Sequence, residues 1–127
     1  MANRHFVGTP KTLNREVVEI DVVFDVGATG APTLKSAPYN EGVSSVSRST
    51  NGTYLVTLQD KYYGLLGGGG FLMEDAVGDS DLYLQIDDES IQSAGTFVLK
   101  CMTGATPTDP ASGTDVHFTV RLLNAKD

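Results

Sequence analysis

Few side chains in this sequence have the chemistry that a reaction site needs. Among its 127 residues, only His5 and His117 could act as a base near neutral pH. His5 lies near the start of the chain, and His117 lies on the polar side of an expected strand, so neither has a visible acid and nucleophile beside it. Two histidines and one cysteine are also too few for three-histidine or cysteine-rich zinc sites. The sequence therefore predicts a protein that is not an enzyme and has no catalytic residue.

The single cysteine, Cys101, has no partner for a disulfide within the chain. It alternates with Phe97 and Leu99 in the segment TFVLKCM, and this spacing places the three side chains on one face of a strand. We therefore expect a buried, unreactive thiol and a core held together by packing alone.

Acidic side chains gather between Glu74 and Glu89, where seven acids and no base occur. Carboxylate oxygen is the ligand that Ca²⁺ prefers, but the EF-hand order of acids, central glycine and final glutamate is missing. Solvated turns are the favoured interpretation, and a divalent-cation site between the loops at Asp79 and Asp88 stays open. Paired carboxylates could also act on a glycosidic bond, yet the sequence places no two of them in an apolar pocket. No metal and no cofactor are predicted.

Four consecutive glycines, Gly67 to Gly70, could bring backbone N–H groups close to a phosphate. Phosphate-binding loops, however, place their glycines before a helix, often followed by Lys and Ser or Thr. Here the apolar residues Phe71, Leu72 and Met73 follow, and they indicate a strand. We therefore expect the run to form a flexible turn or a close packing contact.

The chain is acidic, with a formal net charge of -7 and a pI near 4.6. Nucleic acids and anionic membranes attract basic surfaces, so we expect neither as a partner. No apolar run approaches the roughly 18 residues that cross a bilayer, and no signal peptide opens the sequence. We expect the protein to be made and folded in the cytoplasm.

Apolar and polar residues alternate along much of the chain, whereas helical periodicity is nearly absent. The clearest hairpin has Asn51 and Gly52 at its turn, residue types that tolerate the positive φ of tight turns. One helical turn is expected over Asp60 to Leu66. The pattern predicts seven strands: Glu16 to Val26, Val43 to Ser49, Thr53 to Leu58, Phe71 to Val77, Asp81 to Asp87, Thr96 to Met102 and Val116 to Leu123.

This spacing predicts an all-β fold, a β-sandwich or jelly-roll-like barrel of about seven strands with an extended N-terminal arm. The length suits one core, so we assign residues 1–15 to the arm and residues 16–127 to a single β domain. On the first strand, Val17 and Val23 interrupt the polar face, which indicates a second contact there.

Three regions are candidates for binding a partner. The N-terminal arm carries basic residues that could dock on an acidic neighbour, with a solvated tail as the alternative. Tyr62 and Tyr63 cannot both point inward from a strand, so at least one is expected to cap the barrel or meet a partner. The polar loop Thr103 to Asp115 is long, and is either seated on a neighbouring subunit or a plain flexible loop. The predicted contact residues are Arg4, His5, Phe6, Lys11, Arg15, Tyr62, Tyr63, Thr106, Pro107 and Pro110.

The stretch SVSRSTNGTYLVTLQDKYYGLLG resembles a recurring segment of small structural proteins of tailed bacteriophages. In that segment a Ser/Thr-Arg strand, a Gly turn, a Tyr-x-Val-x-Leu strand and an Asp-x-Tyr corner follow one another. These elements are here Ser47 and Arg48, Gly52, Tyr54 with Val56 and Leu58, and Asp60 with Tyr62. The resemblance extends more loosely to the strand Val116 to Leu123.

This resemblance implies a capsid decoration or cement protein on the virion surface. Such a protein would bind the outer surface of the major capsid protein and stabilise the shell through many modest interfaces. The resemblance also implies a homo-oligomer, with a trimer suggested by the threefold sites of capsid lattices. Three alternatives stay open: a tail, collar or fibre-base protein, a carbohydrate-binding β-sandwich with exposed tyrosines, and a hydrolase that uses acidic pairs.

Overall fold

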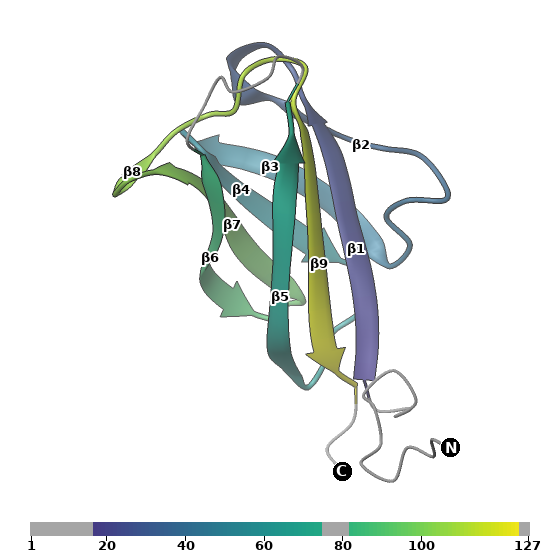
Figure 1. Ribbon diagram of the computed structural model, residues 1–127. Helices are drawn as coiled ribbons and strands as arrows, with labels where there is room; N and C mark the ends of the chain where they lie inside the picture. The colour runs from purple at the N-terminus through teal and green to yellow at the C-terminus, as the bar shows by residue number, and fades with distance from the viewer. Residues whose placement is uncertain (1–16, 75–81, 125–127) are drawn as a thin grey trace, which may run out of the picture.

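Two antiparallel β-sheets pack face to face in the computed structural model, which describes residues 17–74 and 82–124 (Figure 1). The strands are β1 (Val17–Val26), β2 (Pro32–Leu34), β3 (Val43–Thr50), β4 (Thr53–Leu58), β5 (Gly64–Met73), β6 (Tyr83–Ser90), β7 (Thr96–Thr103), β8 (Thr106–Pro107) and β9 (Asp115–Leu123). Sheet A has the order β2-β1-β9-β5, and sheet B has the order β3-β4-β7-β6, with β8 paired to β7. The predicted all-β sandwich is confirmed. Two short strands, β2 and β8, lie in segments expected to be loops.

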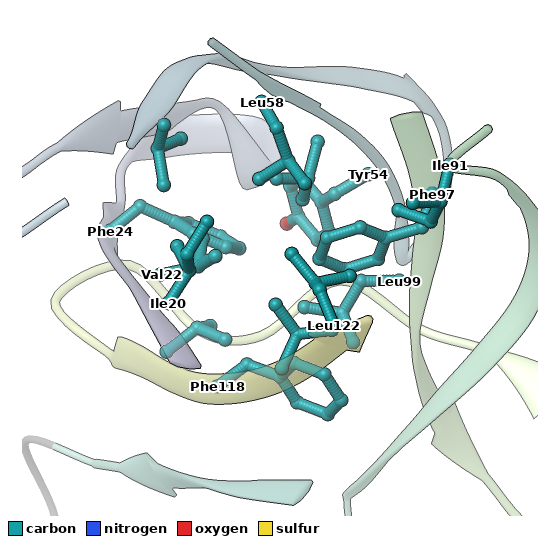
Figure 2. Packing of buried hydrophobic residues seen from close by; sticks show 14 of the residues in the cluster. Ile20, Val22, Phe24, Tyr54, Leu58, Ile91, Phe97, Leu99, Phe118 and Leu122 are labelled. Atoms are coloured by element: carbon teal, nitrogen blue, oxygen red, sulfur yellow. The ribbon is translucent and has the colours of Figure 1, made fainter. Parts of the chain in front are cut away.

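Alternation along each strand directs one set of side chains into the space between the sheets. In β1, Val22 and Phe24 are buried whereas Asp21 is exposed. β9 pairs with β1 so that Val22 lies opposite Phe118 and Phe24 opposite Val116, and both strands present apolar residues to the same side. Figure 2 shows how these side chains meet those of sheet B in one cluster. Burial of each large side chain stabilises the fold by about 1.5–3 kcal/mol.

Sheet B contributes Tyr54, Phe97, Leu99 and Cys101 to this cluster. The ring of Tyr54 is fully buried beside Phe24, with ring centroids 5.0 Å apart, and its hydroxyl donates a 2.9 Å hydrogen bond to the carbonyl oxygen of Gly30. Burial raises the pKa of the Cys101 thiol to about 12, and the thiolate is the reactive form of cysteine. The prediction of a buried Cys101 is confirmed.

The predicted hairpin is present as β3 and β4, joined by Asn51 and Gly52. Gly52 has a φ of 61°, whereas Asn51 does not have positive φ, so the expectation for Asn51 is wrong. The side-chain oxygen of Asn51 instead accepts a 2.6 Å hydrogen bond from Nη2 of Arg48. The register shifts between Arg48 and Thr50, which places one extra residue in β3. This bulge lets a turn with a single left-handed residue connect the two strands.

The four glycines lie inside strand β5, which pairs with β9 along its length. The helical turn expected over Asp60 to Leu66 and a flexible turn at the glycines are therefore both wrong. A Cβ atom on Gly70 would overlap the carbonyl oxygen of His117 on β9. The alternative expectation, a close packing contact, is confirmed, because a side chain at Gly70 would force the two strands apart. The strand expected to begin at Phe71 corresponds to the last three residues of β5, and its residues 75–77 lie outside the described residues.

Val23 makes the second contact that its place on the polar face of β1 indicated. Its side chain is 3% exposed although it points to the outer face of sheet A. The side-chain amide of Asn40 bonds to both backbone groups of Val23, accepting from its N–H at 2.8 Å and donating to its carbonyl oxygen at 2.7 Å. The segment before β3 is thereby fixed over the end of β1, and it carries Tyr39 to this face of the molecule.

Candidate interaction surface

Strand β5 is an edge of sheet A that lacks the usual protection of edges. It pairs with β9 on one side, and no described strand pairs with its other side. Folded proteins protect exposed edges with charges or prolines, which discourage pairing with another chain. The ten residues Gly64–Met73 contain neither. An uncharged edge of this length favours contact with another chain.

Exposed apolar side chains surround this edge. The exposed fraction is 40% for Leu66, 56% for Phe71, 53% for Met73 and 46% for Tyr83 on neighbouring β6. We call these four residues the edge patch. Of these four, Phe71 and Tyr83 line a groove of about 410 Å³ between the end of β5 and the start of β6, which lie at the same side of the sandwich (Figure 1). Exposed apolar side chains beside a groove commonly mark interaction sites.

The opposite half of the β6 edge is protected. Asp87, Asp88 and Glu89 are exposed there, and the register shifts between Ile86 and Asp88. Charges and a bulge are the devices that keep an edge from pairing. Between these two strands, the unprotected edge therefore consists of β5 and the start of β6.

The two adjacent tyrosines do not both point inward, as the sequence predicted. Tyr62 is half-buried and packs against the core, and burial raises the pKa of its hydroxyl. Tyr63 is 39% exposed, and its backbone N–H donates a 2.7 Å hydrogen bond to the carbonyl oxygen of Leu123. Tyr63 therefore presents its ring to solvent beside the start of β5, whereas Tyr62 closes one end of the core.

The loop Thr103 to Asp115 is anchored to the hairpin of β3 and β4. Asp109 receives hydrogen bonds from Nε and Nη2 of Arg48 at 3.0 and 2.8 Å, and from the backbone N–H of Gly52 at 2.7 Å. These bonds hold the pKa of Asp109 below its usual range, the Arg48 guanidinium being the main cause. This anchor could not be predicted from the sequence, because its partners are far apart along the chain.

The predicted contact residues of this loop have different surroundings. Thr106 is exposed and Pro107 is half-buried on β8, whereas Pro110 is buried within the domain. Burial of Pro110 was not anticipated, and Thr106 is the residue of this loop prediction that offers most surface. The predicted contacts Arg4, His5, Phe6, Lys11 and Arg15 lie outside the described residues.

A hollow of about 490 Å³ lies on the outer face of sheet A. Its lining residues come from β1, β9, β5 and the segment before β3: Asp21, Val23, Tyr39, Gly69, Gly70, Phe71, His117, Phe118 and Thr119. This site could not be predicted from the sequence, because Tyr39 precedes β3 in the chain, yet folds over β1. The only indication in the sequence was that Asp21, Phe71, His117 and Thr119 alternate with core residues and so face outward from their strands.

Two carboxyl groups meet at the end of this face. Asp25 and Asp115 are paired across β1 and β9, and Nζ of Lys35 lies 3.3 Å from the first and 3.2 Å from the second. A hydrogen bond between the two carboxyl groups raises the pKa of Asp115 and lowers the pKa of Asp25. Glycosidases separate their carboxyl groups by about 5 Å or more, so this hydrogen-bonded pair does not have their geometry. No group of three His, Cys, Asp or Glu side chains within residues 17–74 and 82–124 could hold a metal ion.

Comparison of the chain with protein-family models, with curated proteins and with solved structures found no match. Of the described segments, none is a helix long and apolar enough to cross a membrane.

Proposed function

We propose that this chain is a non-enzymatic structural protein of a tailed bacteriophage virion, which decorates the capsid by binding the outer surface of the major capsid protein. The observation that carries the proposal is the open edge of β5 with its edge patch, a surface suited to burial between protein neighbours. The segment that resembles phage structural proteins supplies β3, β4, the corner at Asp60 and Tyr62, and the start of β5.

The edge patch joins copies of the chain to one another. A second β-strand can add to the free N–H and C=O groups of β5, while Met73 and Tyr83 lose contact with water. Stable interfaces bury about 800 Å² per partner. Repetition of such modest contacts over a shell multiplies their effect, which is how many weak interfaces stabilise a large assembly.

The test begins with the mass of the purified protein by light scattering, followed by co-sedimentation with phage capsid shells and measurement of the temperature at which shells disrupt. We expect an oligomer that saturates the shells and raises that temperature. The variant Met73→Lys places a charge in the edge patch and should shift the mass toward the monomer.

Ser45→Lys is the matched control, because it adds the same charge at an exposed position of β3, the edge strand of sheet B. It should leave the mass unchanged. A wild-type monomer that ignores capsid shells would overturn the proposal, and association with purified tails instead would favour a tail, collar or fibre-base protein.

A further inference from the structure

The hollow on the outer face of sheet A combines two exposed aromatic rings with a polar floor. Tyr39 is 46% exposed and Phe71 is 56% exposed, and both line the hollow. Phe71 lies parallel to the imidazole ring of His117, with ring centroids 4.7 Å apart and an interplanar angle of 7°. This stacking fixes the orientation of His117 on β9 and supports the ring of Phe71 on the exposed edge strand.

The floor of the hollow is the row Gly69, Thr119 and Asp21, which lie side by side on β5, β9 and β1. The Thr119 hydroxyl donates a 2.6 Å hydrogen bond to Oδ1 of Asp21, so the carboxylate has an ordered position and lone pairs left to accept further bonds. Gly69 adds no side chain, and a Cβ atom built there would meet nothing within 4 Å. The floor is therefore open above Gly69 and carries hydrogen-bond acceptors beside it.

His117 contributes a polar atom that lacks a hydrogen-bond partner in the described part of the chain. Its Nε2 is buried, and no described group bonds to it. Buried polar atoms without a partner are rare in folded proteins. His117 therefore leaves one polar atom in the lining of the hollow unsatisfied by the described residues.

From this arrangement we propose that the hollow binds one or two pyranose rings of a neutral saccharide. The C–H face of a sugar ring is apolar and packs on aromatic side chains, here Tyr39 and Phe71. Sugar hydroxyls are donors, and the carboxylate of Asp21 is a strong acceptor for them. The volume lies within the range of roughly 300–1,000 Å³ that small-molecule sites occupy.

The charges at the hollow select against anionic ligands. Asp21 is acidic, and no lysine or arginine is among the residues that line the hollow. A phosphate or a uronic acid would therefore meet repulsion without a cationic partner. The inference goes beyond capsid decoration and does not depend on it, because the saccharide site lies on the sheet face and needs neither oligomer nor shell.

The proposal is tested by NMR titration of the ¹⁵N-labelled full chain with cellotriose, maltotriose and triacetylchitotriose. We expect at least one to bind in the millimolar range or tighter, with amide shifts concentrated at Gly69, Gly70 and Thr119. Phe71→Ala, Tyr39→Ala and Asp21→Asn should each weaken binding about tenfold or more. Trigalacturonate, an anionic trisaccharide, should not bind.

Tyr83→Ala is the matched control, since Tyr83 has the same exposed fraction as Tyr39 but does not line the hollow. It should leave the affinity unchanged, and thermal unfolding of each variant checks that the fold persists. Three results would overturn the inference: no shift with any neutral probe, equal affinity for trigalacturonate, or binding that survives all three hollow variants. A dimer that Phe71→Ala dissociates, in a protein that binds no saccharide, would assign the face to a second copy instead.

Discussion

At the scale of single residues, Gly52 joins the hairpin to the loop that folds over it. Its φ is 61°, and a Cβ atom would lie 2.5 Å from the Thr108 nitrogen and 2.7 Å from the carbonyl oxygen of Cys101. A side chain would therefore meet two constraints, the left-handed backbone and the backbone of neighbouring segments.

These two constraints can be separated by experiment. Gly52→Ala should lower the free energy of unfolding by about 2–4 kcal/mol, measured by urea denaturation, because both the strain and the overlap act. Gly104→Ala is the control, since Gly104 also has positive φ (58°) but a Cβ atom there would meet nothing within 4 Å. It should cost only about 1 kcal/mol. Equal losses for the two variants would show that the loop does not constrain Gly52.

Asp109 stabilises the loop in a pH-dependent way. Because Arg48 lowers its pKa in the folded state, the ionised carboxylate contributes stability above the unfolded pKa of about 3.9, and this contribution is lost as the pH falls through the lower folded pKa. Asp109→Asn should lower the free energy of unfolding by about 1 kcal/mol at pH 7. The difference from wild type should shrink as the pH falls below about 4. A constant difference from pH 7 to 3 would contradict this mechanism.

At the scale of elements, the pairing of β5 with β9 depends on backbone approach rather than on side chains. Gly70→Ala should lower the free energy of unfolding by about 2–4 kcal/mol, because the added methyl overlaps the His117 carbonyl. Gly69→Ala changes the neighbouring residue where space is open, so it should be neutral or stabilising by up to about 1 kcal/mol. Similar effects of the two substitutions would argue against the register of β5.

Some strands could be predicted from the sequence more accurately than others, for physical reasons. β1, β4 and β9 were predicted to within about two residues because their alternation is set by burial of one face. Only the end of β5, from Phe71, was predicted as a strand. Its four glycines have low strand propensity, and the contacts that stabilise them are made by β9, far along the chain. β2 has only three residues, Pro32–Leu34, too few for an alternating pattern to be recognised.

The surfaces were less predictable than the strands. The sequence predicted that Tyr62 and Tyr63 would not both point inward, but not which of the two is exposed. The edge patch depends on which strand lies outermost in sheet A, and strand order is not encoded in local periodicity. The hollow brings Tyr39 beside Phe71 and His117 from three separate segments, so only the fold could place them together.

At the scale of the whole molecule, two kinds of contact are proposed: between copies of the chain, and between the chain and the capsid shell. The residues proposed for them differ in charge. The edge patch is uncharged, whereas the predicted contacts of the N-terminal arm include Arg4, Lys11 and Arg15 in a chain of net charge -7. Salt screens charge pairs over about 10 Å at 0.1 M, and hydrophobic contacts are not weakened in this way.

Raising NaCl from about 0.05 to 0.5 M should therefore leave the mass of the oligomer unchanged by light scattering, while weakening its co-sedimentation with capsid shells. Removal of residues 1–11 should abolish the salt dependence of shell binding and keep the oligomer intact. Salt-induced dissociation into monomers would show that charged groups, rather than the edge patch, hold the copies together.

The central place of β9 in sheet A has a consequence for the order of events during synthesis. β1 and β5 do not pair with each other, and each pairs with β9, the last strand of the chain. Sheet B can form from hairpins close in sequence, but sheet A must wait until β9 has left the ribosome, and contacts between such distant segments form slowly. The open edge and the hollow both belong to sheet A, so both take shape only after β9 has paired with β1 and β5.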